Sequence, residues 1–168
     1  MTVRVWGCAR HAQIGRTCCQ DTEILLSEGD LARIAAHTGR TDFHETVPVA
    51  NPEYAPDDSD PTWRSGFHAD GTRPVLRHAA GGDCTFLGER GCTLPLDVRP
   101  LVCRIYPYTH DEHGVGPVST QCPAEVAPPG RSVTEALGLE RTDAVQWHAQ
   151  LYAELRAHPR SVRPESRG

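Results

Sequence analysis

The sequence predicts a small, irregular α+β fold, mostly α with a short β-hairpin, as a metal-stapled single domain. Three observations lead to this prediction. Hydrophobic residues make up 38% of the 168 residues and aromatic residues only 6%, so the apolar core is expected to be thin. The 15 Gly and 14 Pro favour irregular backbone. The seven cysteines fall in short clusters, and metal cross-links between them would offset a thin core.

The length of the chain fits one domain, since single cores typically contain about 100 to 200 residues. We expect a cysteine-cluster metal-binding domain at residues 1–127 and a helical segment at 128–158 that packs on it. Residues 159–168 are rich in Arg, Ser and Pro and predict a disordered tail.

The clearest helix of the first half is expected at residues 28–38. Ser27 stands three residues before Asp30, which is the spacing of a capping box. Apolar residues then recur at helical spacing until Gly39 supplies a stop. A second, shorter helix is expected to begin at Thr41 or Asp42.

A loop and a hairpin are expected in the middle of the chain. Residues 48–62 contain four prolines and a run of aspartates, so no regular element is expected there. Trp63 and Phe67 should anchor this loop to the core. Residues 73–78 and 84–87 predict the two strands of the hairpin.

The second half predicts two helices separated by loops. Pro100 suits the first turn of a short helix that presents Cys103, and residues 110–117 predict a polar loop. Residues 139–157 give the strongest helical pattern in the chain, after a capping box at Ser132. The residues expected to face the core from this helix are Ala144, Trp147, Leu151 and Leu155.

The cysteines indicate a metal site. Seven is an odd number, so the cysteines cannot all pair as disulfides, and the chain opens without a secretory segment, which indicates a reducing, cytoplasmic location. Disulfides and unconnected buried thiols are the alternatives. The candidate metal ligands are Cys8, His11, Cys18, Cys19, Cys84, Cys92, Cys103 and Cys122.

Thiolates suit zinc, copper(I) and iron–sulfur clusters. Eight donors could fill two tetrahedral zinc sites, and the alternative is an iron–sulfur cluster on four of the cysteines. The cofactor expectation is therefore zinc or iron, with zinc and iron held as near equals. Removal of the metal is expected to unfold much of the region from Cys8 to Cys122.

Two arginines are expected to lie next to the ligands of the metal centre and to stabilise it. Arg99 and Arg104 flank Cys103, and permanently charged guanidinium groups would offset the negative charge of several thiolates. The alternative is that both are ordinary surface arginines.

Composition excludes several classes of function. The net charge of −5, with no concentrated basic patch, argues against a nucleic-acid partner. All 17 basic residues are Arg, so a P-loop lysine and a Schiff-base lysine are excluded. No apolar run approaches the length of a membrane span. The expected partner is a metal ion, and a protein partner is left open.

The cysteine motifs resemble those of a known family. The pair Cys18-Cys19, the string CTFL-GERG-C, the string RPLVCRIYP and a final Cys-Pro resemble the YkgJ-like cysteine-cluster family, described as a zinc- or iron-chelating domain. The resemblance covers about Cys8 to Cys122. It implies that the family's metal-binding set includes Cys18, Cys19, Cys84, Cys92, Cys103 and Cys122. The spacing of Cys8 and His11 ahead of the pair departs from the family pattern.

Three classes of function follow from these observations. The first is a metal-binding domain whose site is structural or serves chelation and transfer. The second is a metalloenzyme that performs chemistry beside Arg99, Arg104, His78 or His110. The third is a zinc-stapled interaction module. The sequence contains no nucleotide-binding fingerprint, G-x-S-x-G elbow or H-E-x-x-H motif, so no substrate is indicated.

Overall fold

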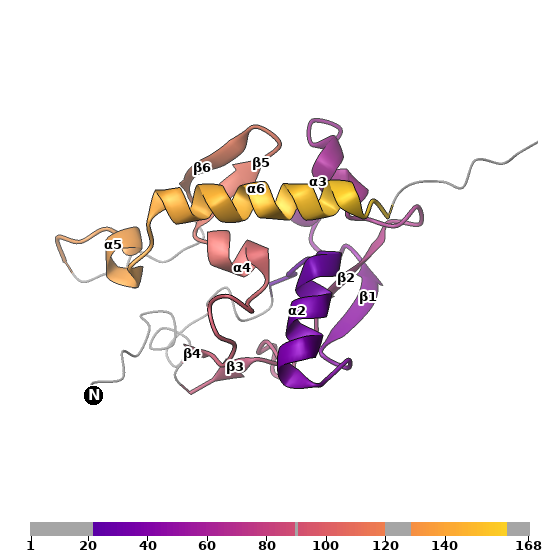
Figure 1. Cartoon of the computed structure of the whole chain (residues 1–168), viewed down its shortest axis with the longest axis horizontal. Coiled ribbons are helices and arrows are strands. Elements are labelled where there is room, and N and C mark those ends of the chain that lie inside the picture. The colour runs from indigo at the N-terminus through magenta and orange to yellow at the C-terminus, as the bar shows by residue number, and fades with distance from the viewer. Residues whose placement is uncertain (1–21, 90, 120–128, 161–168) are drawn as a thin grey trace, which may run out of the picture.

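The computed structural model describes residues 22–89, 91–119 and 129–160 (Figure 1). Its helices are α2 (Glu28–Thr38), the 3-10 helix η1 (Pro52–Tyr54), α3 (Pro61–Ser65), α4 (Leu101–Ile105), α5 (Val133–Leu137) and α6 (Arg141–Ala157). Its strands form three antiparallel pairs: β1 (His44–Pro48) with β2 (Thr72–Leu76), β3 (Leu87–Gly88) with β4 (Gly91–Cys92), and β5 (Tyr108–Asp111) with β6 (Gly114–Val118).

The predicted fold class is wrong in two respects. The described residues are not mostly helical with one hairpin, because three separate two-stranded sheets accompany the helices. The expected metal staple is also not found within them, since no group of three or more His, Cys, Asp or Glu side chains in the described ranges could hold an ion. Two apolar clusters and a buried polar network hold these residues together instead.

The helix expected after Thr41 is a strand. Residues 44–48 form β1, whose β-branched Thr46 and Val47 favour extended backbone, and Pro48 ends it. The strand pairing predicted for the hairpin is wrong as well, because β2 pairs with β1. The two predicted strands are joined by an isolated bridge between His78 and Cys84 and by a 3.0 Å backbone hydrogen bond from Thr85 N to Arg77 O.

Both predicted loops contain regular structure. The segment at 48–62 includes η1 and the start of α3, where the Asp60 side chain accepts a hydrogen bond from Trp63 N. The segment at 110–117 belongs to the β5–β6 hairpin. Its turn is closed by a 2.8 Å bond from His113 N to the carboxylate of Asp111, so polar composition alone did not indicate a loop.

The capped helices are confirmed. Ser27 and Asp30 form a capping box at the start of α2, and Gly39 ends that helix with a φ of 68°, in the left-handed region that favours glycine. Ser132 begins α5 with a second capping box. The strongest predicted helix is found as α6, which begins two residues later than expected.

The core is divided into two apolar clusters. Cluster 1 contains Ile24, Leu26, Ile34, Phe43, Leu76, Cys84, Phe86 and Leu94. Cluster 2 contains Leu25, Phe67, Leu101, Ile105, Leu151, Tyr152 and Leu155. Adjacent residues of the extended segment before α2 supply both, because side chains alternate across extended backbone.

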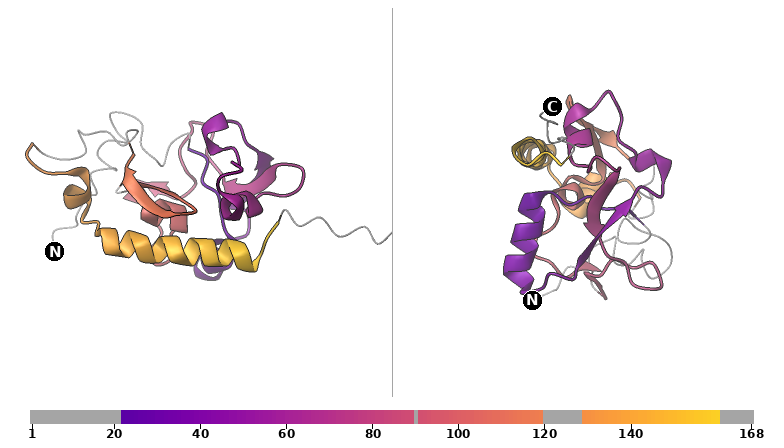
Figure 2. Two further views of the ribbon diagram at one scale, coloured as in Figure 1. Left: turned by 90° about the horizontal axis from the view of Figure 1, so that it is seen from above. Right: turned by 90° about the vertical axis from the view of Figure 1, so that its right-hand side faces the viewer.

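Helix α6 is the longest element and contacts α2, α3, α4 and β6 (Figure 2). Arg160, just beyond its end, donates hydrogen bonds to Leu26 O and Gly66 O, at 2.7 and 2.9 Å. Among the described residues, none of the helices combines the length and apolar character needed to cross a membrane.

Candidate metal centre

Three of the predicted ligands lie in the described residues, on three different segments. Cys84 forms the isolated bridge with His78 and is 8% exposed. Cys92 is the second residue of β4, and Cys103 is the middle residue of α4. The remaining predicted ligands lie outside the described residues: Cys8, His11, Cys18, Cys19 and Cys122.

A turn leads from Cys84 into the β3–β4 hairpin, and Cys92 lies in the second strand of that hairpin. Leu87 connects them, because its N–H donates to Cys84 O at 2.9 Å and it lies opposite Cys92 in the β3–β4 pair. Gly91 has a φ of 103°, which strongly favours glycine, and it allows the hairpin to close. The backbone therefore holds both cysteines in a fixed relation.

All three cysteines contact cluster 1. Cys84 is one of its buried members, and Cys92 and Cys103 pack against it. Apolar surroundings disfavour an unpaired thiolate, so a negatively charged sulfur here requires a metal ion or nearby cations. This environment fits soft thiolate coordination of zinc or iron better than it fits a hard cation.

His78 offers a nitrogen donor next to Cys84. Its Nε2 atom is buried and has no hydrogen-bond partner within the described part of the chain. Directly opposed residues of an antiparallel bridge place their side chains on the same face, so His78 lies next to Cys84. Imidazole and thiolate together form a donor set that zinc and iron accept.

Arg99 and Arg104 hold the segment that joins Cys92 to Cys103. The Nε atom of Arg99 donates to Leu94 O at 2.9 Å. Arg104 donates from Nε to Arg99 O at 2.8 Å and from Nη2 to Asp97 O at 2.6 Å. The hydrogen bonds of these two arginines, which flank Cys103 in sequence, therefore hold the loop that precedes α4.

The charge of Arg104 is buried. Arg104 is only 6% exposed. Within the described ranges, no carboxylate forms an ion pair with its guanidinium group. Burial and the positive charge of Arg33 lower its pKa. A buried guanidinium next to Cys103 in α4 would be stabilised by a negatively charged centre.

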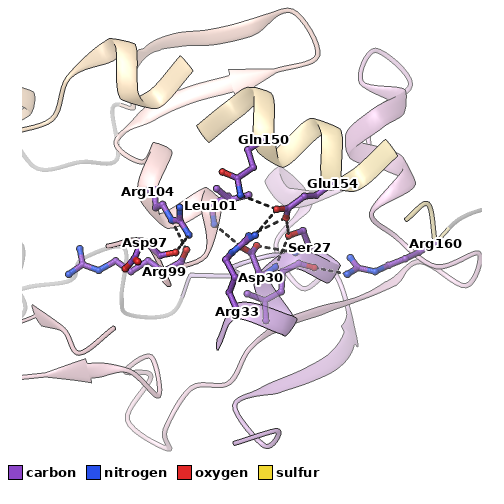
Figure 3. A network of polar contacts seen from close by, with 11 residues as sticks. Ser27, Asp30, Arg33, Asp97, Arg99, Leu101, Arg104, Gln150, Glu154 and Arg160 are labelled. Carbon is purple, nitrogen blue, oxygen red and sulfur yellow. Dashed lines mark hydrogen bonds and ion pairs between the residues drawn. The ribbon is translucent and has the colours of Figure 1, made fainter. Parts of the chain in front are cut away.

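A polar network joins α2 to α6 and to the first residue of α4 (Figure 3). Arg33 of α2 forms a 2.6 Å ion pair with Glu154 of α6 and a 2.7 Å pair with Asp30. Ser27 donates to Glu154 at 2.5 Å. The sequence indicated the capping box but not its connection to α6, because the partners are 121 or more positions apart.

His110, a possible catalytic neighbour of the centre by sequence, packs among aromatic rings. Its ring centroid lies 5.5 Å from that of Trp63 and 5.9 Å from that of Tyr152. Tyr152 was not among the predicted core or site residues, although it directly follows Leu151 on α6 and is buried.

Comparison with known proteins identifies the family. Residues 13–123 match the model of the CxxCxxCC family, described as "Putative zinc- or iron-chelating domain". This range includes Cys18, Cys19 and Cys122 with the three described cysteines, and it begins after Cys8 and His11. No curated protein and no solved structure matches the chain. The chain therefore belongs to the CxxCxxCC family of zinc- or iron-chelating domains, and its general function is metal binding.

Proposed function

We propose that this protein chelates zinc or iron through thiolates of Cys84, Cys92 and Cys103 together with cysteines of the N-terminal pair and Cys122. The observation that supports this most is the contact of three cysteines, carried by three segments, with one apolar cluster. Family membership supports the same chemistry, since the matched range contains all six of these cysteines.

His78 is proposed as a nitrogen donor next to Cys84, and the described residues alone do not form a group of three donors that could hold an ion. Its buried Nε2 has no partner there, and a buried imidazole nitrogen left unbonded is costly unless something coordinates or hydrogen-bonds it. Cys8 and His11 precede the family match, so they are proposed as additional ligands rather than as part of the shared set. A bound zinc or iron ion would supply Lewis acidity, and an iron–sulfur cluster would supply electron transfer.

A second candidate function is metalloenzyme activity. One observation favours it: Cys103 also lines a cavity of about 1130 Å³ whose wall includes Trp63 and His110. A substrate in that cavity would lie against the same helix that presents a proposed ligand. In a purely structural centre, no open space beside the ligands would be needed.

Anaerobic purification with elemental analysis and visible spectroscopy tests the proposal. Zinc–thiolate sites are colourless, whereas iron–thiolate and iron–sulfur centres absorb visible light. We expect stoichiometric zinc or iron in the wild-type protein and loss of most of it in Cys84→Ser and Cys103→Ser. Val145→Ser is the control, because Val145 is 49% exposed on α6 and lies outside the family match.

Further variants test which residues belong to the proposed ligand set. Cys8→Ser and His11→Ala should reduce the metal content only if a second ion is bound outside the family's shared set. His78→Ala should weaken metal retention against a chelator while a folded spectrum is kept. A Cys84→Ser, Cys103→Ser double variant that is folded and binds metal like the wild type would refute thiolate chelation by these residues.

A further inference from the structure

A large cavity opens beside α4, between the segment of η1, helix α3 and strand β5. Its volume is about 1130 Å³. Aromatic side chains form part of its wall, contributed by Tyr54, Trp63, Tyr106 and Tyr108. Among the described residues, no three side chains form a group that could hold a metal ion. The described lining residues therefore do not make this cavity a second metal site.

His110 lies in the cavity wall and is oriented by a buried relay. The hydroxyl of Tyr152 donates a 2.6 Å hydrogen bond to Asp60 Oδ2. The oxygen of this hydroxyl lies 3.5 Å from His110 Nδ1. Because the tyrosine proton is engaged with Asp60, we infer that Nδ1 carries the imidazole proton and directs it at the tyrosine oxygen. The other ring nitrogen, Nε2, is then left as a hydrogen-bond acceptor.

His110 is a lining residue of the cavity, and we infer that its Nε2 edge is the one that faces the open space. Nδ1 is turned toward Tyr152, which is not a cavity-lining residue, so Nε2 lies on the opposite edge of the ring. Within the described ranges, no hydrogen bond to His110 Nε2 is formed. The ring is held edge-on between Trp63 at 5.5 Å and His148 at 5.9 Å, and His148 is itself bonded to Asp111 O at 2.8 Å.

His110 is neutral at physiological pH. Burial lowers its pKa to about 4, and the nearby charge of His148 acts in the same direction. The nitrogen therefore presents a lone pair rather than a proton to the cavity. A ligand that meets it must bring its own N–H or O–H donor.

The other charged groups on the wall favour a cation. The acidic lining residues are Glu23, Glu53, Asp57, Asp58, Asp60 and Asp111. Arg64 is the single Lys or Arg among the described lining residues, and it forms an ion pair with Asp58. Aromatic faces beside carboxylates attract ammonium and guanidinium groups through cation–π contacts and charge.

We propose that this cavity binds a small organic cation, a protonated amine or a guanidinium, which donates an N–H to His110 Nε2. The face of Trp63 packs against the apolar part of the ligand, and the wall carboxylates offset its charge. This site is separate from the thiolate centre in chemistry and does not depend on which metal is bound. Because Cys103 also lines the cavity, the ligand would lie on the same side of α4 as a proposed metal ligand.

Calorimetry on the full-length, metal-loaded protein tests the proposal with four probes of one size. n-Butylammonium and ethylguanidinium are expected to bind saturably, whereas n-butanol and butyrate are not. His110→Phe keeps the aromatic packing but removes the acceptor, so it should weaken butylammonium binding about tenfold, the value of one charge-assisted hydrogen bond. His113→Phe is the matched control, because His113 is exposed on the β5–β6 turn and does not line the cavity.

Nitrogen NMR of the wild-type imidazole gives a second test that needs no variant. Butylammonium should shift the His110 Nε2 resonance and leave that of His113 unchanged. Equal binding of n-butanol and n-butylammonium would overturn the proposal. Unchanged affinity in a folded His110→Phe variant, or an Nε2 resonance that does not respond at saturation, would also overturn it.

Discussion

The carboxylate of Asp30 accepts a 3.1 Å hydrogen bond from the backbone N–H of Leu101, which ties the first turn of α2 to the first residue of α4. The same carboxylate accepts from Ser27 N at 3.1 Å and pairs with Arg33 at 2.7 Å. Asp30 is 0% exposed. The helix that carries Cys103 is therefore positioned by a buried residue that lies 71 positions before its first residue in sequence.

Replacement of this carboxylate should destabilise the protein. Asp30→Asn removes the charge that pairs with Arg33 and directs an amide donor at groups that are donors themselves. We expect the free energy of unfolding to fall by about 3 kcal/mol, the usual cost of breaking a buried pair. Urea denaturation measures this change.

Asp143→Asn is the matched control for Asp30→Asn. Asp143 also stands in the first turn of a helix, α6, but it is exposed. We expect the free energy of unfolding to fall by less than about 0.5 kcal/mol, because only the interaction of this charge with the helix dipole is lost. Similar losses in both variants would contradict a special role for the bond to Leu101.

Gly29 is expected to be intolerant of a side chain. A Cβ at this position would meet the carboxylate of Glu154, which is held in place by Arg33 and Ser27. Gly29→Ala should therefore lower the midpoint of thermal unfolding, since either the ion pair or the α2–α6 contact must yield. Gly81→Ala should leave it unchanged, because no atom lies within 4 Å of a Cβ there. A Gly29→Ala protein as stable as Gly81→Ala would show that Glu154 moves freely.

Arg104 should influence metal retention through its buried charge. Arg104→Gln keeps donors near Asp97 O and Arg99 O but removes the charge, and we expect metal transfer to a competing chelator to be about tenfold faster. Arg104→Lys should give an intermediate rate, because the charge remains while the planar pair of bonds is lost. Arg131→Gln, at an exposed position, is the control. Equal rates in Arg104→Gln and wild type would make Arg104 a purely structural residue.

His110 should make the fold sensitive to acid. Its pKa is lowered to about 4 by burial and by His148, with Asp111 opposing, whereas an unfolded histidine titrates near its usual value of 6.5. Between these values the unfolded state binds the proton and the folded state does not, so stability falls as the pH falls. The full effect is about 3 kcal/mol.

Comparison of wild type with His110→Phe isolates this contribution. The groups that act on the imidazole, His148 and Asp111 together with the Tyr152–Asp60 pair, are present in both proteins. Urea denaturation at several pH values between about 6.5 and 4 should show a steeper loss in wild type. Parallel stability curves for the two proteins would indicate that His110 is not held neutral by the fold.

The sequence by itself determined the helices with explicit end signals and the identity of the metal-binding motifs. The capping box of α2 and the glycine at its end depend on residues within one or two turns, so local sequence specifies them. The apolar stripe of α6 is periodic over several turns for the same reason. The short cysteine motifs also predicted the family, and the match over residues 13–123 confirms this prediction.

Only the tertiary structure decided which strands pair and what surrounds the cysteines. Residues 73–78 were expected to pair with the next strand, but β2 pairs with β1, because cross-strand packing depends on distant partners rather than on the intervening turn. The same applies to Asp30 with Leu101 and to Tyr152 with Asp60, which are 71 and 92 positions apart. The first bond joins α2 to α4 and the second joins the start of α3 to α6, so both depend on how the helices pack, and no local pattern in the chain encodes them.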